Sequence, residues 1–322
     1  MMTTPELSVV VPSYGCLGCL EELCARLDSV LRSLVPSFEI VIVDDRSPDN
    51  SWPLTASLAS RYASVRGIRL SRNFGQQMAI TAGLESARGQ YVVVMDCDLQ
   101  DPPERIPDLL EEIKKGYDLV LARRMERSHS AFRRASANLY FRIMRTLTGE
   151  SVDGSYGTFS ILSRKVVDAF LRFGERERHY LFILRWLGFR CGTIEYAHGD
   201  RYAGNSAYSL SRLIKHALGG VFFQTSVFLT WIIYAGLFFT ALSFVGGCFF
   251  IYRHFVMTAL PGWTSLFVAI LFSTGLVLAS IGTVGLYIAR IFEIAKDRPM
   301  YVVDTECGCG ESEDHLPIEG RV

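Results

Sequence analysis

The chain has 322 residues, a formal net charge of zero and 49% hydrophobic residues, and its length suits one large domain or two ordinary ones. The apolar residues are unevenly spread, because residues 217–252 and 255–289 contain no Asp, Glu, Lys or Arg. These two runs argue against an entirely soluble protein, since about 20 apolar residues suffice for a helix to cross a bilayer.

The first 125 residues alternate between short apolar segments and amphipathic segments. We predict strands, rich in Val, Ile and Leu as strands covered on both faces are, at residues 7–11, 39–43, 67–70, 91–95 and 119–122. Helical patterns lie between them, near residues 20–34, 50–63, 76–88 and 104–115. This alternation predicts an α/β domain with a mostly parallel sheet and helices on both faces. In such a domain ligands bind beyond the carboxyl ends of the strands.

Polar residues follow the first two predicted strands. Pro12 and Tyr14 end the first strand, where a tyrosine ring can pack against a nucleobase. Asp44 and Asp45 end the second, where carboxylates can accept hydrogen bonds from a base or a ribose. The residues after them suit the start of a helix. We therefore expect Asp49 or the asparagine after it to cap a helix, while the two earlier carboxylates face a ligand.

Two acidic residues, Asp96 and Asp98, follow the strand predicted at residues 91–95. Residues two apart in an extended segment point the same way, so both carboxylates can approach one hard cation, which prefers oxygen ligands. Gln100 is a plausible further ligand. A divalent ion there could bridge the phosphates of a nucleoside diphosphate and stabilise charge on the leaving group. The alternative is an acidic pair in a turn, which the sequence QDPPE directly after it makes less favoured.

After residue 125 the pattern changes to basic amphipathic segments. Residues 132–147 can form one helix with arginines along one side, and residues 206–222 can form a second. Basic amphipathic helices suit a membrane surface, and helices that pack within the domain are the alternative. The second segment continues directly into the first uncharged run, which favours the membrane.

We place two membrane-spanning helices near residues 227–252 and 263–288. A buried soluble core helix is the alternative, and it is less favoured because only Arg253 and His254 interrupt the two uncharged runs. Basic residues lie outside both runs, so both termini and the domain that precedes the runs should be cytoplasmic. We expect a cytoplasmic domain at residues 1–205 and a juxtamembrane helix at 206–226. A transmembrane hairpin should follow at 227–292 and a partly disordered tail at 293–322.

The eight cysteines include one CxxC pair at Cys16 and Cys19 and one CxC pair at Cys307 and Cys309. A zinc site usually takes four ligands from two spaced pairs, and these pairs lie at opposite ends of the chain. We expect free thiols in a reducing compartment and assign them no chemistry.

Four motifs together resemble those of inverting family 2 glycosyltransferases: VVVPSY at 9–14, DDRSPDNS at 44–51, RNFGQQ at 72–77 and DCDLQDPPE at 96–104. The closest similarity is to polyprenyl-phosphate glycosyltransferases, which include dolichol-phosphate mannose synthases and bacterial undecaprenyl-phosphate glucosyl- or aminoarabinosyltransferases. The resemblance covers nearly the whole chain, including the two C-terminal spans. It implies a GT-A fold and a nucleotide-sugar donor.

The resemblance also implies roles for individual residues. Asp153 becomes the candidate base or acceptor-orienting carboxylate, because its segment would lie beside the site, and a loop cap is the alternative. Pro12 and Tyr14 would contact the donor. Asp44, Asp45 and Arg72 would hold the nucleotide. Asp96, Asp98 and Gln100 would hold Mg²⁺ or Mn²⁺. Arg123, Arg134 and Arg201 would hold the lipid phosphate.

Three departures from the family's pattern leave alternatives open. Gly15-Cys16 stands where Asn-Glu is usual, Ser160 where relatives often have Arg, and Ala207 where they often have Lys. A non-catalytic, nucleotide-sensing membrane scaffold on the same fold is therefore one alternative. A processive polysaccharide synthase is another, although the segment FILRW at 182–186 lacks the glutamine of the QxxRW signature.

The expected reaction is attack by a lipid phosphate oxygen on the anomeric carbon of the sugar, with inversion. A phosphate monoester is largely dianionic at neutral pH, so it needs positioning by arginines rather than a strong base. The expected donor is a UDP-sugar such as UDP-glucose, and the expected acceptor is undecaprenyl phosphate at the inner (cytoplasmic) membrane. We also expect the chain to form a homo-oligomer, for example a tetramer, and to have no nucleic acid partner.

Overall fold

The computed structural model describes residues 4–125, 156–174, 178–197 and 298–308, and some of the positions between 266 and 296. The chain divides into two compact units. One consists of Met1–Ala135, Asp153–Ser206 and Pro299–Val322, and the other of Ser136–Val152 and Ala207–Arg298. The described strands all belong to the first unit, which also takes in the last residues of the chain.

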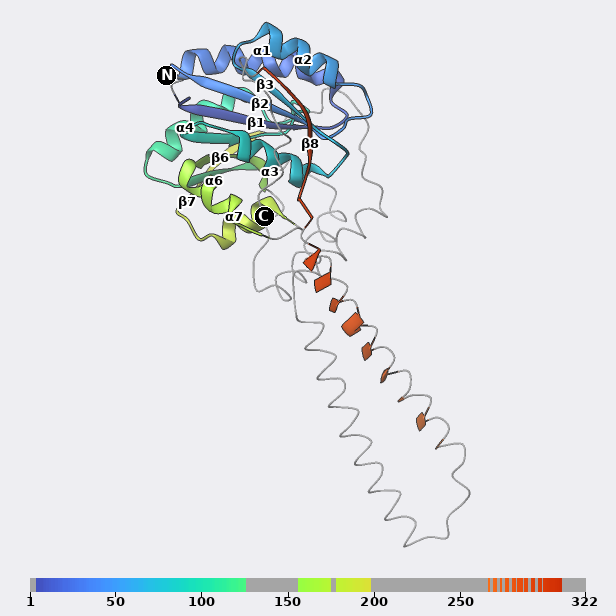
Figure 1. The fold of residues 1–322 in the computed structure, drawn as a ribbon. Coiled ribbons are helices and arrows are strands. Elements are labelled where there is room, and N and C mark those ends of the chain that lie inside the picture. The colour runs from blue at the N-terminus through green and yellow to red at the C-terminus, as the bar shows by residue number, and fades with distance from the viewer. Residues whose placement is uncertain are drawn as a thin grey trace, which may run out of the picture. The chain divides into compact units, whose positions relative to one another are not determined.

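An eight-stranded sheet forms the centre of the first unit (Figure 1). Its order is β7-β5-β6-β4-β1-β2-β3-β8. The four central strands β4, β1, β2 and β3 are parallel, β6 is antiparallel to both β4 and β5, and β8 is antiparallel to β3. The bounds are β1 Leu7–Ser13, β2 Phe38–Asp44, β3 Val65–Leu70, β4 Tyr91–Val94, β5 Leu119–Met125, β6 Tyr156–Ser163, β7 Cys191–Ala197 and β8 Val303–Cys307.

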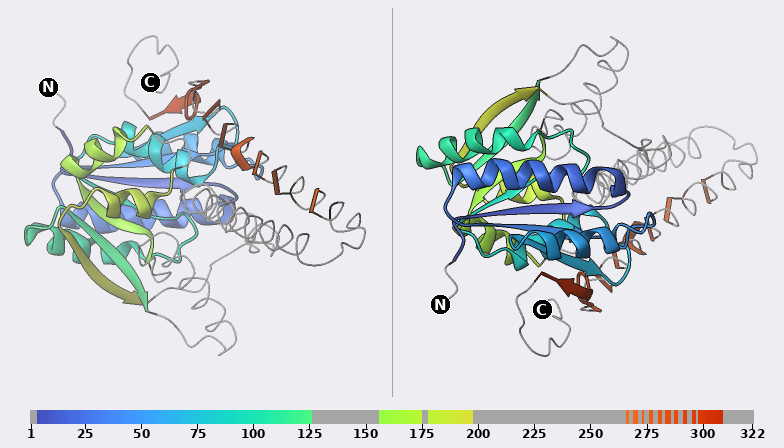
Figure 2. Two further views of the ribbon diagram at one scale, coloured as in Figure 1. Left: turned by 90° about the horizontal axis from the view of Figure 1, so that it is seen from below. Right: turned by 90° about the horizontal axis from the view of Figure 1, so that it is seen from above.

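Helices cover both faces of the sheet. The bounds are α1 Leu17–Leu34, α2 Trp52–Arg61, α3 Gln76–Ser86, η1 Pro103–Arg105, α4 Ile106–Lys114, α6 Arg164–Leu171 and α7 Tyr180–Trp186. Helices α1, α2 and α4 pack on one face and α3, α6 and α7 on the other. In Figure 2 the blue α1 lies in front in the right-hand view, and the yellow-green α6 and α7 lie in front in the left-hand view.

The two apolar clusters follow from the alternation of side chains along each strand. In β1, Val9 and Val11 belong to the cluster under α1, whereas Val10 belongs to the cluster under α3. All three side chains are fully buried. The sequence therefore needs apolar residues at every position of this strand, which explains why the central strands read as continuous apolar runs.

The α/β class, the mostly parallel sheet, and the five strands and four helices predicted within the first 125 residues are confirmed. No helix in the described part of the chain is long and apolar enough to cross a membrane. The predicted span at 227–252 and the amphipathic segments at 132–147 and 206–222 lie outside the described residues, and the span at 263–288 is described only in part.

The tail predicted at residues 293–322 to be partly disordered contains an ordered strand, β8. This strand pairs with the edge of β3, and Tyr301 just before it is buried and donates a hydrogen bond to Glu85. Arg46 Nη1 lies 2.7 Å from Asp304 Oδ2. The acidic composition of the tail gave no sign of a strand. A short edge strand can form with few apolar side chains, because backbone hydrogen bonds to the neighbouring strand stabilise it.

The close packing of α3 on β1 generates a test. A Cβ atom added to Gly83 would lie well inside van der Waals contact with Val10. We expect Gly83→Ala to lower the free energy of unfolding by about 1–3 kcal/mol through overpacking. Adding Val10→Ala should recover part of this loss, since the smaller side chain makes room for the new methyl group. Thermal unfolding of the two single variants and the double variant measures the coupling, and strictly additive losses would contradict this packing.

Candidate active site

Three loops meet at the carboxyl edge of the central strands. Ser13 at the end of β1 pairs with Asp44 at the end of β2, and the backbone N–H of Asp45 donates to Ser13 O over 3.0 Å. On the other side of β1, Val10 pairs with Val94, the last residue of β4. The loops that follow β1, β2 and β4 are therefore neighbours, as the sequence predicts for a ligand site of this class.

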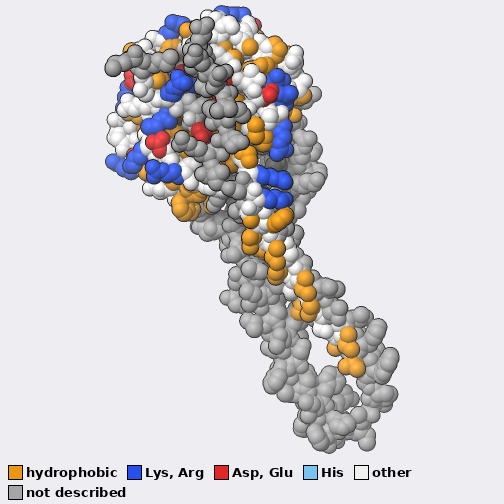
Figure 3. Space-filling view, viewed as in Figure 1, with side chains coloured by type: hydrophobic (Ala, Val, Ile, Leu, Met, Phe, Trp, Pro, Cys, Tyr) orange, Lys and Arg blue, Asp and Glu red, His pale blue; other side chains and the backbone are white. Residues whose placement is uncertain are grey.

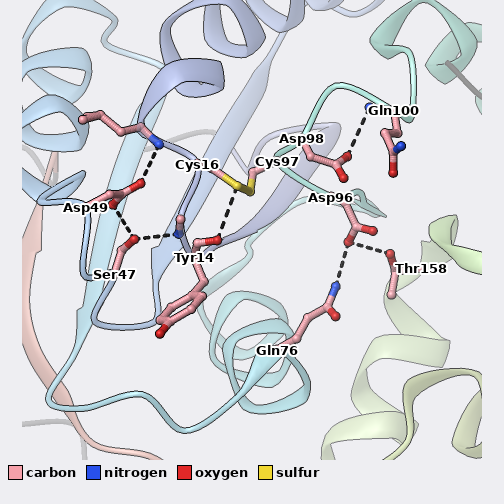
Figure 4. Close-up of a disulfide and its surroundings, with 12 residues drawn as sticks. Tyr14, Cys16, Ser47, Asp49, Gln76, Asp96, Cys97, Asp98, Gln100 and Thr158 are labelled. Carbon is pink, nitrogen blue, oxygen red and sulfur yellow. Dashed lines mark hydrogen bonds between the residues drawn. A yellow bond between two sulfur atoms is a disulfide. The ribbon is translucent and has the colours of Figure 1, made fainter. Parts of the chain in front are cut away.

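Asp96 lies in the loop after β4 and is held from two other elements. Its Oδ1 accepts hydrogen bonds from Gln76 Nε2 of α3 and from Thr158 Oγ1 of β6, each 2.8 Å long (Figure 4). Loss of solvent, and then the charges of Asp101 and Asp98, raise the pKa of Asp96 to about 6. This carboxylate is thus fixed in place while its negative charge is only partly compensated.

Asp98 folds back on its own loop. Its Oδ1 accepts the backbone N–H of Gln100 over 3.1 Å, and Leu99 between them has a left-handed φ of 62°. The predicted ligand Gln100 thus contributes its backbone to this turn, and the role of its side-chain oxygen stays a prediction. Figure 4 shows the carboxylates of Asp96 and Asp98 on the side of the loop away from Cys16.

A buried cluster behind the loop supports these carboxylates. Asp101 is fully buried, and it accepts a hydrogen bond from the hydroxyl of Tyr196 on β7. Arg124 on β5 places Nη2 3.5 Å from Asp101 Oδ1 and 3.9 Å from Asp96 Oδ2, while its Nε donates to Tyr196 over 3.2 Å. Burial raises the pKa of Asp101. Arg124 therefore connects both acids to the sheet.

The contacts of Arg124 with the acidic loop were not predicted from the sequence, and the predicted role of its neighbour Arg123 in binding the lipid phosphate stays a prediction. Arg123 Nη1 lies 3.5 Å from Glu195 Oε1 on β7, whereas Arg124 lies beside Asp96. Adjacent residues of a strand point to opposite faces, so this alternation, combined with the strand order, was the signal that could have found Arg124. Arg134, Arg201 and Asp153 lie outside the described residues.

Asp44 and Asp45 are buried at the end of β2. Asp45 accepts the backbone N–H groups of Phe74 over 2.7 Å and Gly75 over 2.8 Å, which fixes the loop before α3. Asp44 accepts the backbone N–H of Ser47 over 2.9 Å. Burial raises the pKa of both carboxyls. In the structure these two residues shape their loops, and their direct contact with a nucleotide stays a prediction.

Tyr14 and Arg72 are both solvent-exposed at this edge. The Tyr14 side chain is 51% exposed, and the guanidinium of Arg72 lies over the ring of Phe74 at 4.4 Å from its centroid. Pro12 is buried within β1. Exposure leaves the tyrosine ring available for stacking, as predicted for contact with a base.

Asp49 organises the loop around Tyr14. Its Oδ2 accepts the backbone N–H of Leu17, the first residue of α1, over 2.8 Å. Its Oδ1 accepts the Ser47 hydroxyl over 2.5 Å, and Ser47 Oγ in turn accepts the N–H of Gly15 over 2.7 Å. Burial by itself raises the pKa of Asp49, but the hydrogen bonds to its charged form outweigh the loss of solvent, so the pKa is lowered. The motif after β2 therefore holds the loop after β1.

The expectation of free thiols is wrong for Cys16 and Cys97, which form a disulfide with their Cα atoms 6.3 Å apart. They are separated by 81 positions in the sequence. The pairing could not be read from the CxxC spacing, because it depends on β1 and β4 being neighbours in the sheet. Cys24 is buried and Cys191 is exposed, and both are thiols.

The raised pKa of Asp96 predicts a pH effect on the metal-free protein. Between about pH 4 and pH 6 the folded state keeps a proton that the unfolded chain has released, so the free energy of unfolding falls as the pH rises. The contribution of this one carboxyl is about 3 kcal/mol. Asp96→Asn removes this pH-dependent contribution. In thermal unfolding in EDTA, the stability of the variant should therefore increase relative to that of the parent protein as the pH rises from about 4 to 6. Parallel stability curves would contradict the environment described for Asp96.

Comparison with known proteins identifies relatives over most of the chain. Residues 8–171 match the family described as glycosyl transferase family 2. A glycosyltransferase of Bacillus subtilis, YkcC, described as uncharacterised, is 34% identical over 305 residues, 94% of each chain. The bactoprenol glucosyl transferase of Shigella phage SfV is 35% identical over 83% of this chain and 88% of that one.

A prophage bactoprenol glucosyl transferase homologue of Escherichia coli K12 is 33% identical over 82% of this chain and 87% of its own. These relatives extend well past the family match, into the C-terminal half of the chain. The strand order and the acidic loop after β4 agree with the GT-A-like architecture that the motifs imply. The chain belongs to glycosyl transferase family 2 and is a glycosyltransferase.

Proposed function

We propose that this glycosyltransferase moves a sugar, with inversion, from a nucleoside diphosphate to the phosphate of a polyprenol at the cytoplasmic face of a membrane. The observation that carries the proposal is the placement of Asp96 and Asp98 at the carboxyl end of β4, within an acid-rich cluster. Relatives of 33–35% identity are named bactoprenol glucosyl transferases, which supports a polyprenyl phosphate as acceptor and glucose as the first sugar to test.

The donor set suits a divalent cation. Asp96, Asp98 and Asp101 bring three carboxyls close together, and Arg124 is the cation that faces two of them. Within the described ranges, no group of three or more His, Cys, Asp or Glu side chains forms a metal site by itself. Mg²⁺ is commonly bound by one or two carboxylates together with substrate phosphates. Asp96 and Asp98 therefore fit a cation that the donor's diphosphate helps to bind.

The two carboxylates and the neighbouring loops would each contact a different part of the donor. A bound Mg²⁺ or Mn²⁺ would neutralise charge on the departing nucleoside diphosphate. Tyr14, exposed beside the loop after β2, is suited to stack on the base, and Arg72 to approach the phosphates. A UDP-sugar is the donor that we propose, and UDP-glucose is the first candidate.

The acceptor phosphate is a nucleophile without activation by a strong base. Because it is largely dianionic at neutral pH, the protein has to position it and offset its charge rather than remove a proton from it. Arg123 lies near the end of β5, and we propose that it acts with Arg134 and Arg201 on this phosphate. Asp153 would orient the acceptor.

A membrane location is supported by the apolar side chains of the second unit. Its described positions include helical residues with exposed large apolar side chains (Figure 3), namely Leu266, Ile270, Val277, Ile281, Val284, Ile288, Ile291 and Phe292. Exposed apolar side chains of this kind suit contact with another apolar environment, such as lipid. Together with the uncharged runs 217–252 and 255–289, they support a hairpin that anchors the enzyme beside its lipid substrate.

The direct test is an incubation of the purified full-length protein with undecaprenyl phosphate and a panel of nucleotide sugars in the presence of Mn²⁺. Mass spectrometry of the lipid fraction should show one lipid carrying a single sugar phosphodiester, with UDP-glucose as the expected donor. A polymer would instead identify a processive synthase. Binding of UDP without turnover on any polyprenyl phosphate would identify a nucleotide sensor.

Removal of the cation or its ligands should stop the reaction. We expect Asp98→Ala to lower kcat by at least about a thousandfold, because charge on the leaving group is no longer offset, and excess EDTA to abolish turnover reversibly. Turnover is measured as sugar transfer at saturating donor and acceptor. Asp108→Ala, on the exposed side of α4, is the matched acidic control and should keep normal activity. Full activity in EDTA would refute the proposed cation site.

The neighbours Arg123 and Arg124 provide a matched pair of variants. Arg124→Ala removes the guanidinium that holds Asp96 and Asp101 in position, and we expect it to weaken Mn²⁺-dependent binding of UDP by about tenfold or more, because the site is no longer preorganised. Arg123→Ala should raise the KM for polyprenyl phosphate while UDP binding is unchanged. Calorimetric titration with UDP and steady-state kinetics separate the two effects. The opposite pattern would show that the two arginines have exchanged roles.

A further inference from the structure

The disulfide between Cys16 and Cys97 joins two loops of the proposed donor site. Cys16 lies two residues after Tyr14 and is the N-cap of α1, and its carbonyl accepts the backbone N–H groups of Cys19 over 2.9 Å and Leu20 over 3.3 Å. Cys97 lies between the carboxylates Asp96 and Asp98. A single covalent bond therefore connects the loop suited to hold a base with the loop suited to hold a cation.

The bond leaves the carboxylates unobstructed. Figure 4 shows the Cys97 side chain directed to Cys16, on the opposite side of the loop from the carboxylates of Asp96 and Asp98. Cys16 and Cys97 are 8% and 6% exposed, so the sulfurs lie beneath the site surface. The disulfide can act on the site only through the position of the two backbones.

We propose that Cys16 and Cys97 form a reversible redox switch that sets the affinity of the enzyme for its nucleotide donor. The inference rests on the proposed function. In the disulfide state the spacing between Tyr14 and the pair Asp96–Asp98 is fixed, and the donor binds a preorganised site. In the dithiol state the two loops are joined only by non-covalent contacts, and donor binding has to order them.

The chemistry is thiol–disulfide exchange with a low-molecular-weight disulfide. The Cys16 and Cys97 thiols lose two protons and two electrons as the S–S bond forms, and the small disulfide takes them up and becomes two thiols. Reduction reverses each step. After reduction the Cys16 thiol can donate to the carbonyl of Tyr14, from which Cys16 Sγ is 3.7 Å away. The reduced Cys16 thiol therefore has a hydrogen-bond acceptor within its own loop.

A switch suits the proposed location better than a permanent crosslink. In the cytosol thiols are kept reduced, and the disulfides that do form there are usually transient, catalytic or redox-sensing. Cys16 and Cys97 belong to the apolar cluster under α1, which includes many other residues. Both cysteines lie in the loops at the sheet edge where the substrate binds in our proposal.

The test compares UDP binding by the full-length protein after equilibration with oxidised or reduced glutathione. Calorimetric titration with UDP in the presence of Mn²⁺ should give at least about fivefold tighter binding in the oxidised protein, the lower end of common coupling between sites. Non-reducing peptide mapping should recover the Cys16–Cys97 peptide only from that sample. A readout without metal or nucleotide is thermal unfolding, in which the oxidised protein should melt several degrees higher.

Three variants make the comparison specific. Cys16→Ser, outside the acidic motif, should bind UDP as the reduced parent does under both conditions, and Cys97→Ser should behave in the same way. Cys191→Ser removes an exposed thiol on β7 and should keep the full response to glutathione. Because Cys16→Ser leaves Asp96, Asp98 and the residue between them intact, it remains informative if the variant within the motif fails to fold.

Two results would overturn the switch, and they differ from failure of the proposed function. Equal UDP affinity in the oxidised and reduced parent protein, with the crosslinked peptide present in the former, would show that the bond does not control the site. Absence of that peptide after oxidation would show that the pair does not form. If UDP binds in neither state, the donor site itself is refuted, and the switch with it.

Discussion

The parallel pairing of β1 with β2 on one side and with β4 on the other determines which residues can share a site. Because parallel strands end at the same edge, this pairing brings Tyr14, Asp45 and Asp96 together from three separate motifs. It also places Cys16 opposite Cys97. The hydrogen bonds that Asp45 accepts from the loop before α3 add the fourth motif to the same edge.

The site concentrates negative charge that the protein only partly offsets. Thr158 and Gln76 donate to Asp96, and Tyr196 and Arg124 contact Asp101. Each of these contacts stabilises an ionised carboxylate, yet the pKa of Asp96 stays above its ordinary value. A cation in the proposed position would supply the missing positive charge. The polar contacts thus fix the geometry of the carboxylates, while a bound ion and its phosphate ligands would complete their electrostatics.

The sequence predicted the elements whose signal is local and missed those that depend on long-range pairing. Apolar runs identified β1 to β5, and an acidic pair after β4 identified Asp96 and Asp98. Strand β6 mixes polar and apolar residues, and one of the polar residues, Thr158, donates a hydrogen bond to Asp96. Its pattern therefore did not predict a strand. The choice between Arg123 and Arg124 needed the register of β5 with β7. The partner of Cys16 likewise required the strand order, which no spacing of cysteines contains.

Strand β8 gives the sheet a boundary formed by residues from the far end of the chain. A fragment that stopped at residue 205 would lack this strand and leave the backbone groups of β3 open for pairing with other molecules, a known route to aggregation. It would also lose Asp304, the partner of Arg46 in the motif after β2. Expression of the catalytic unit for crystallisation therefore calls for a fragment that replaces the intervening residues with a linker and retains residues 299–308.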